Sequence, residues 1–290
     1  MQLVAYGAQD VYLTGNPQIT FFKVVYRRHT NFSIESIVQS PNGNPAFGSR
    51  ITCQISRNGD LLHKLMLEAT IDLPETNSVG VDAYIQPWVG YNILKSLEIE
   101  IGGQRIDKQY GQWMYIWNEL SLPSGKLAGF KKMVGEDLLA VHGAVKLYIP
   151  LEFWFCRNVG LALPLIALQY HEVKVNITFA SDMTGITMQG ASLWVDYIFL
   201  DTDERRRFAQ MSHEYLIEQV QFTGSEQIGT SGNKVKLNFN HPVKELIWVA
   251  KDTVDTAWNA FEKVDKVKLQ LNGNDRFAER NAEYFSHVQP

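Results

Sequence analysis

The stretch LEIEIGGQRIDKQYGQWM, residues 97–114, decides the fold, because its pattern returns near the C-terminus as VKLQLNGNDRFAERNAEYF, residues 267–285. In each copy apolar residues alternate, a glycine-containing corner follows, and an aromatic-rich segment runs back. This order predicts a strand, a tight turn and a return. With a one-residue insertion Trp113 aligns with Tyr284. Two copies in the same relative place indicate two related β domains.

Strand signals dominate the rest of the chain. Asn58-Gly59 lies between two apolar runs, residues 50–56 and 61–73, and predicts a hairpin of these runs. The other β-branched and aromatic runs are bounded by Gly, Pro, Asn or Asp, and they cover residues 32–38, 145–155, 172–179 and 192–200. Together the runs predict a two-sheet sandwich.

Strand periodicity gives each strand one inward face, so the same runs predict a core. We expect the core of the first domain to include the following residues or their alternates: Ile51, Cys53, Ile55, Leu65, Leu67, Leu97, Ile99, Val175, Ile177, Trp194 and Tyr197. Residues 74–89 and 121–139 are long connections between strands. We expect the second, which carries Lys126, Lys131 and Lys132, to be a loop that makes contacts.

Helix is the minority state. Asn16-Pro17 supplies an N-cap and a first-turn proline, but residues 19–26 are also suited to a strand, so both readings stay open there. Residues 203–210 carry acids first and bases later, an order that favours a helix. Because this helix follows a complete set of strands, we place a domain boundary over residues 201–212. The second domain should open with strands over residues 235–239, 246–249 and 267–271.

The composition is that of a globular protein, since 45% of the 290 residues are hydrophobic and 12% are aromatic. A formal net charge of -4 gives the whole surface no reason to bind nucleic acid or an anionic membrane, and we expect no sequence-specific nucleic-acid binding. Cys53 and Cys156 form neither a disulfide framework nor a metal-ligand spacing, which suits a reducing compartment. Without a signal-peptide pattern or an apolar run of the ~20 residues that span a bilayer, we expect a cytosolic protein.

The sequence contains no catalytic, cofactor or metal motif, and we expect no enzyme activity. Residues 123–129 include Ser-Gly-Lys without the spacing of a P-loop, and Gly102-Gly103 suits a hairpin turn better than a phosphate site. Glu98 and Glu100 share a strand face, where solvation is more common than a glycosidase dyad. The histidines never occur at metal-ligand spacing; they are His29, His63, His142, His171, His213, His241 and His287.

Two basic clusters are candidates for contact with an anionic partner. Arg27-Arg28-His29 and Arg205-Arg206-Arg207 have the chemistry to bind phosphate oxygens, for instance on an internal membrane. For the first cluster the question of an anionic partner stays open. Asn31 and Asn176 match the glycosylation pattern, but without a signal peptide neither counts as a site. For the second cluster we favour ion pairing with the acidic residues beside it, which are Asp201, Asp203 and Glu204.

Three long stretches then bring a family into view, namely residues 7–35, 201–221 and 269–290, which begin GAQDVYLTGNPQITFF, DTDERRRFAQMSHEYL and LQLNGNDRFAERNAEYF. Through them the chain resembles, from end to end, the major capsid proteins of nucleocytoplasmic large DNA viruses, the iridovirus, phycodnavirus and mimivirus group. The resemblance implies an all-β fold of tandem (double) jelly rolls. We expect an N-terminal arm at residues 1–30, a complete first jelly roll at 31–212 and the N-terminal part of a second, incomplete one at 213–290.

The resemblance also implies a structural virion protein that forms homotrimers. Such trimers would be pseudo-hexagonal capsomers of an icosahedral capsid, assembled in the host cytoplasm, with neighbouring capsomers, minor capsid proteins and an internal membrane as partners. A duplicated jelly roll gives a trimer six similar corners, and six corners tile a plane. The alternative is a carbohydrate- or ligand-binding jelly roll with Trp113, Trp117 or Trp154 as stacking platforms, although such residues more often fill a core or a subunit contact.

Members of this family are longer than the present chain, so we hypothesise a C-terminally truncated copy of a longer gene product. Residues 213–290 hold about half the strands of a jelly roll, which would leave open edges and an apolar face. We therefore expect the trimer to form only when the second domain is complete. Protease should cleave first between residues 210 and 234 and leave a resistant N-terminal piece.

Overall fold

The computed structural model describes residues 30–74, 88–136, 138, 141–181, 183, 185–229, 232–250 and 264–289. The expected arm apart from Thr30, the open helix or strand after Pro17 and the Arg27-Arg28-His29 cluster therefore lie outside the described residues. Within the described residues, no helix combines the length and apolar character needed to cross a membrane.

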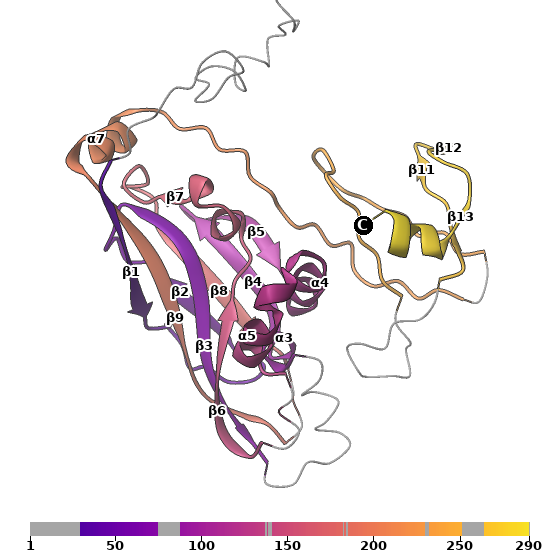
Figure 1. Ribbon diagram of the computed structural model, residues 1–290, viewed down its shortest axis with the longest axis horizontal. Helices are drawn as coiled ribbons and strands as arrows, with labels where there is room; N and C mark the ends of the chain where they lie inside the picture. Colours follow the sequence, from indigo (N-terminus) through magenta and orange to yellow (C-terminus); the bar gives the residue numbers. More distant parts are fainter. Residues whose placement is uncertain are drawn as a thin grey trace, which may run out of the picture.

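Two antiparallel sheets form the first domain and lie face to face (Figure 1). Within each sheet, each long strand pairs with the strand named next to it. One sheet has β1 (Phe32–Gln39), β9 (Thr187–Leu200), β3 (Leu61–Leu73) and β6 (Gly143–Pro150), and the short β7 (Leu163–Pro164) also pairs with β3. The other has β2 (Arg50–Gln54), β8 (Val173–Phe179), β4 (Leu94–Ile101) and β5 (Gln104–Gln109). The chain changes sheet repeatedly along its length, as in a jelly roll, and the expected all-β sandwich is confirmed.

The β4–β5 hairpin is confirmed, whereas the hairpin at Asn58-Gly59 is wrong. Gly102 and Gly103 have φ values of 60° and 83°, as a two-residue hairpin turn requires. By contrast β2 and β3 belong to different sheets. Gly59 is instead needed for close approach, because a Cβ there would lie 2.7 Å from Cβ of Tyr197. An Asn-Gly pair marks a turn, but the strands that the turn connects choose their partners through the whole fold.

The core lies between the two sheets, and ten of the eleven expected residues are buried there. Trp194 is the exception. Its neighbours Leu193 and Val195 are 0% exposed and point inward, so the alternation of β9 places Trp194 on the outer face. There its indole Nε1 donates a hydrogen bond of 2.8 Å to the Glu68 carboxylate. Trp194 and Tyr197 are three residues apart, and a strand cannot bury both on one face.

Helices pack beside the sandwich, and the last of the three lies where we expected a loop over residues 121–139. They are α3 (Val89–Asn92), α4 (Gly111–Ser121) and α5 (Ser124–Val134). Gly135 ends α5 with a φ of 84°, and its N–H donates to the Lys131 carbonyl at 3.0 Å. Phe130 packs on Trp88 with ring centroids 5.6 Å apart. Apolar packing of this kind outweighs the low helix propensity of the glycines in α5.

The other corrections concern where strands end. The run over residues 145–155 is a strand only to Pro150, and its end forms α6 (Trp154–Arg157), which is followed by the short η2 (Val159–Leu161). The predicted helix after the last long strand is confirmed as α7 (Thr202–Gln210), with the Asp201 carboxylate accepting from the Thr202 N–H at 2.7 Å.

Beyond α7 the described residues contain only short elements. They are β10 (Lys266–Val267), β11 (Gln270–Leu271), β12 (Asn274–Asp275), β13 (Arg280–Asn281) and η3 (Tyr284–Val288). Asn272 and Gly273, at φ 51° and 82°, form the turn of the repeated hairpin, and each copy is followed by a helix. The strands predicted over residues 235–239 and 246–249 are wrong for this structure, because no described residue pairs with them in a ladder.

Candidate assembly surfaces

The residues singled out for metal binding or catalysis in the sequence are placed as follows in the described part of the chain. No group of three or more His, Cys, Asp or Glu side chains there is placed to hold a metal ion. Several histidines instead contact backbone carbonyls; for example, His63 Nδ1 lies 2.9 Å from the Phe155 oxygen. The Ser-Gly-Lys sequence lies in the first turn of α5, and Gly102-Gly103 is a hairpin turn.

Glu98 is the centre of an ion-pair cluster on the outer face of the β2-β8-β4-β5 sheet. Its carboxylate lies 2.9 Å from Arg50, 3.2 Å from Lys108 and 3.5 Å from Arg105. Burial raises the pKa of Glu98, but the hydrogen bond from Lys108 and the surrounding cations outweigh burial and hold it below its usual value. A carboxylate that is held ionised in this way is unsuited to be the general acid of a glycosidase dyad.

The three tryptophans of the carbohydrate-binding alternative offer no open platform. Trp154 is only 4% exposed in the core. Trp117 is covered by the Arg157 guanidinium, which lies 4.2 Å from the ring centroid. Trp113 stacks on Trp117 at 5.8 Å and packs against the core. The structure therefore does not favour sugar stacking at these positions.

Ion pairing was predicted for the three arginines after β9, and two of them, Arg205 and Arg207, form ion pairs. Arg205 Nε lies 2.9 Å from the Asp60 carboxylate, and Arg207 lies 3.2 Å from Glu204. The first partner is distant in sequence, and was not among the acids expected. Asn176 is buried and accepts a hydrogen bond from Thr52 at 2.7 Å, so a glycan has no access there. Asn31 is exposed.

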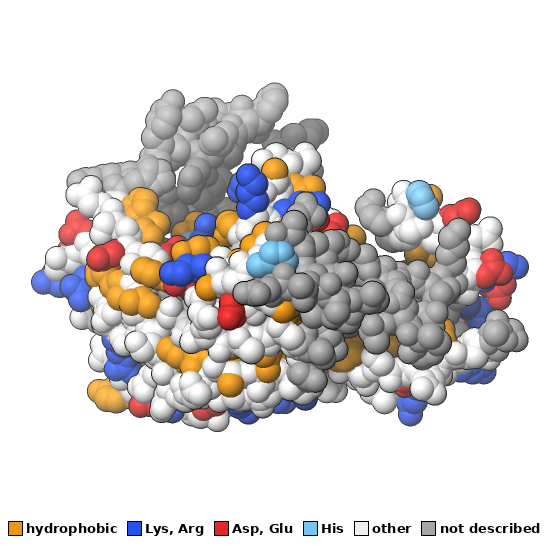
Figure 2. Space-filling view, turned by 90° about the horizontal axis from the view of Figure 1, so that it is seen from below, with side chains coloured by type: hydrophobic (Ala, Val, Ile, Leu, Met, Phe, Trp, Pro, Cys, Tyr) orange, Lys and Arg blue, Asp and Glu red, His pale blue; other side chains and the backbone are white. Residues whose placement is uncertain are grey.

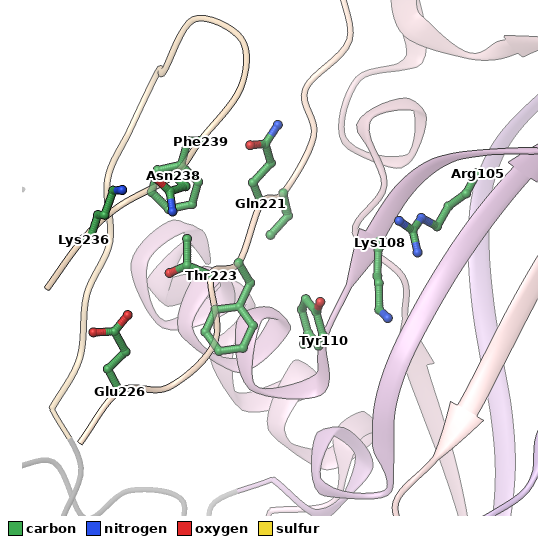
Figure 3. Close-up of a pocket in the computed structure, with 11 residues that line it drawn as sticks. Arg105, Lys108, Tyr110, Gln221, Thr223, Glu226, Lys236, Asn238 and Phe239 are labelled. Atoms are coloured by element: carbon green, nitrogen blue, oxygen red, sulfur yellow. The ribbon is translucent and has the colours of Figure 1, made fainter.

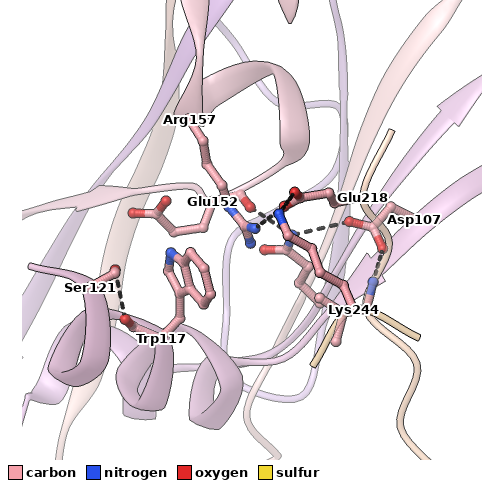
Figure 4. A network of polar contacts seen from close by, with 9 residues as sticks. Asp107, Trp117, Ser121, Glu152, Arg157, Glu218 and Lys244 are labelled. Carbon is pink, nitrogen blue, oxygen red and sulfur yellow. Dashed lines mark hydrogen bonds and ion pairs between the residues drawn. The ribbon is translucent and has the colours of Figure 1, made fainter. Parts of the chain in front are cut away.

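A polar junction that the sequence did not reveal joins the sandwich to the chain beyond α7 (Figure 4). Asp107 of β5 is 3% exposed, and its carboxylate accepts hydrogen bonds from the Val220 N–H and from Gln109 Nε2, each at 3.0 Å. Beside it the Gln219 side chain donates to the Ile106 carbonyl at 2.5 Å. Residues 219–220 thus cover part of β5, which is the edge strand of its sheet.

Arg157 holds the other side of the same junction. Its guanidinium lies over Trp117 and 3.1 Å from the Glu218 carboxylate, which also pairs with Lys244 (Figure 4). The hydrogen bond from Lys244 is the largest cause that holds the pKa of Glu218 below its usual value. Burial raises the pKa of Asp107 and of Glu152, and Arg157 opposes both shifts. The junction therefore joins a buried acidic site in the sandwich to an ion-paired chain segment.

A register shift in the β4–β5 hairpin, at a bulge between Ile99 and Glu100, places the polar residues of this junction. Within the predicted hairpin Asp107 pairs with Ile99, and Gln109 pairs with Leu97. Both polar residues therefore share a strand face with buried apolar ones. A carboxylate at such a position requires hydrogen-bond donors, which here come from a segment more than a hundred residues away in sequence.

A groove of about 440 Å³ continues from the junction (Figure 3). Arg105, Lys108 and Tyr110 lie on its β5 side, and Glu226 and Lys236 come from the extended segments opposite. Two of its cations already pair with Glu98. The groove is therefore a polar surface with largely balanced charge rather than a strong anion site.

Comparison with protein families assigns the chain. A description of the major capsid protein N-terminus matches residues 20–201, and one of the large eukaryotic DNA virus major capsid protein matches residues 204–290. The chain belongs to the major capsid proteins of large eukaryotic DNA viruses. The resemblance seen in the sequence is thereby confirmed. A member of this capsid protein family is a structural component of the virion, and nothing in the comparisons indicates catalysis.

Relatives agree along the chain. The major capsid protein of Pyramimonas orientalis virus is 57% identical over all of this chain and 74% of its own length. That of Phaeocystis pouchetii virus is 52% identical over 87% of this chain and 58% of its own length. That of Paramecium bursaria Chlorella virus 1 is 45% identical over all of this chain and 76% of its own length.

Solved structures of capsid proteins share the fold. A chain of the PBCV-1 virus capsid aligns with a TM-score of 0.79 at 39% identity, over 93% of this chain and 76% of that one. The crystal structure of PBCV-1 VP54, fitted into a cryo-EM reconstruction of the virophage Sputnik, aligns with a TM-score of 0.81 at 39% identity over the same shares. These likenesses confirm the expected jelly-roll capsid fold for the present capsid protein.

Proposed function

We propose that this capsid protein forms homotrimeric, pseudo-hexagonal capsomers that tile an icosahedral shell. The observation that carries the proposal is the jelly-roll strand order of the first domain, together with the second copy of its β4–β5 hairpin at β11–β12. Two similar domains in each subunit give a trimer six similar corners, and this outline packs in a plane. The solved relative described as part of a virus capsid supports the same role.

The domains and partners form part of the same proposal. We place the arm at residues 1–30, the first jelly roll at 31–212 and the N-terminal part of the second at 213–290. Self-association and contact with neighbouring capsomers supply the main interactions, and minor capsid proteins and an internal membrane are further partners. Assembly takes place in the host cytoplasm. We assign no catalytic, cofactor or metal residue and no sequence-specific nucleic-acid contact.

Light scattering during size-exclusion chromatography of the complete gene product tests the proposal. We expect a mass three times that of the chain, and electron microscopy of the same fraction should show particles of hexagonal outline. A glycan array provides the comparison, since a lectin would stay small and bind sugars. A monomer that binds a specific glycan would refute the capsomer.

A further inference from the structure

The outer faces of the two sheets in the first jelly roll differ in the chemistry of their side chains. Across the β2-β8-β4-β5 sheet, the pairing of the strands aligns a row of polar side chains, Thr52, Asn176, Glu98 and Lys108. Thr52 donates to Asn176 at 2.7 Å, and Lys108 pairs with Glu98 at 3.2 Å. These side chains satisfy one another, so the polar groups on this outer face are paired, and Asn176 among them is buried.

A corresponding row across the other sheet is apolar. Strand pairing places Val38, Trp194, Met66 and Pro150 side by side across β1, β9, β3 and β6. These four residues, which we call the apolar row, lie on the outer face, because the residues next to them in the strands point into the core. Val38 is 46% exposed. An antiparallel sheet that faces water on one side normally alternates apolar inside with polar outside, and this row breaks that rule.

The apolar character extends around the row. On β1 the outward residues Phe32 and Ile34 are 66% and 52% exposed, and Tyr148 of β6 is 37% exposed. A hollow of about 170 Å³ lies in the middle of the face. Its lining comes from all four strands and consists of Ser36, Lys64, Met66, Tyr148, Trp194 and Asp196. Two of the six lining residues are aromatic, and aromatic side chains are enriched where a partner side chain binds.

Charge on this face is balanced, and this decides which partner fits. Lys146 pairs with Glu68 at 2.8 Å, and one cation, Lys64, and one anion, Asp196, line the hollow. A lipid surface or a nucleic acid would call for a cationic field, which these residues do not supply. Seen from below, the described surface carries apolar patches with acidic and basic side chains scattered between them (Figure 2). Two copies of a chain with a net charge of -4 repel each other, so they meet best on a locally neutral, apolar face.

We propose that the outer face of the β1-β9-β3-β6 sheet, centred on the apolar row, is a contact surface for a second copy of this chain. The inference rests on the proposed capsomer and assigns a surface through which its subunits contact one another. A ring of three subunits uses head-to-tail contacts, so this face meets a different face of the next subunit. The polar β2-β8-β4-β5 row stays outside this contact.

Cysteine labelling of the complete gene product tests the proposal without disturbing the fold. Val38→Cys places a thiol on the apolar row, and Gln54→Cys places one on the outer face of β2, an edge strand of the other sheet. The native Cys53 is buried and Cys156 is largely so, so they add little background. We expect a maleimide to modify Val38→Cys at least about tenfold more slowly in the trimer than in protein diluted to monomer, and to modify Gln54→Cys equally fast in both.

A second pair of variants asks whether the face contributes to association. Val38→Lys should raise the dissociation constant of the trimer about 100-fold, because a charge is buried without a partner, while Gln54→Lys should leave it unchanged. Near-ultraviolet circular dichroism establishes that both variants fold. A trimer in which Val38→Cys reacts as fast as in the monomer would overturn the assigned face but not the capsomer. Protection that appears only with anionic phospholipid vesicles would overturn the second copy as the occupant. A wild-type protein that never associates would refute the capsomer itself.

Discussion

Replacement of Gly111 by alanine should destabilise the protein severely, although alanine is the better helix former. Gly111 begins α4, and a Cβ at this position would lie 2.2 Å from the carbonyl oxygen of Tyr91 and 2.4 Å from that of Leu94. Both are backbone atoms in the α3–β4 region, which cannot rotate away as the end of a side chain does. Overpacking of this kind costs roughly 1–3 kcal/mol. Because the contacts are so short, we expect a loss of about 3 kcal/mol in the free energy of unfolding.

Gly125→Ala is the matched control, since it makes the same chemical change in the neighbouring helix α5. No atom lies within 4 Å of a Cβ there, so the variant should gain about 0.5–1 kcal/mol from helix propensity. Urea unfolding followed by tryptophan fluorescence measures both changes, provided that the m-value stays constant. If Gly111→Ala unfolds within 0.5 kcal/mol of the wild type, or if both variants shift in the same direction, the steric reasoning fails.

Two further predictions concern titrating groups. Burial raises the pKa of Cys53 to about 11 and also raises the pKa of Cys156. Both thiols of the folded protein should therefore react with an aromatic disulfide reagent at pH 8 about 100-fold more slowly than in urea. Fast reaction of either thiol in the folded protein would contradict its burial. Burial also raises the pKa of Asp107 above 3.8, so the folded state holds this proton more tightly, and stability should fall as pH rises from 3.8 through the raised pKa. Asp107→Asn should flatten that part of the stability curve measured by urea unfolding, and an unchanged slope would assign it to another group.

Local signals predicted the parts of the fold in which sequence neighbours are also partners. The alternation before Gly102-Gly103 and the positive φ that this turn requires belong to one short segment, and the β4–β5 hairpin is as expected. The same kind of signal at Asn58-Gly59 predicted a pairing that does not exist, because β2 pairs with β8 and β3 with β9. The turn residue fixes the bend, but the partner of each strand depends on residues far along the chain.

The junction was hidden for a related reason. Asp107 looked like an ordinary polar residue in a returning strand, since its burial results from the Val220 segment and from register with Ile99. Trp194 was predicted to lie in the core, but the alternation of side chains along β9 places it on the outer face of the sheet. The family resemblance in the sequence identified the capsid fold, but not the residues that join its parts.

The pairing of β1 with β9 has a consequence for synthesis on the ribosome. β1 is an edge strand whose only sheet neighbour among the described strands is β9, and Phe32 pairs with Leu200. Of the described strands β1 leaves the exit tunnel first, so it must wait, with its apolar side chains in water, until its partner β9 is translated. Such long-range closure is slow and exposes nascent chains to mispairing. We therefore expect ribosome-bound chains that stop before β9 to bind a chaperone, and to release it once β9 has emerged.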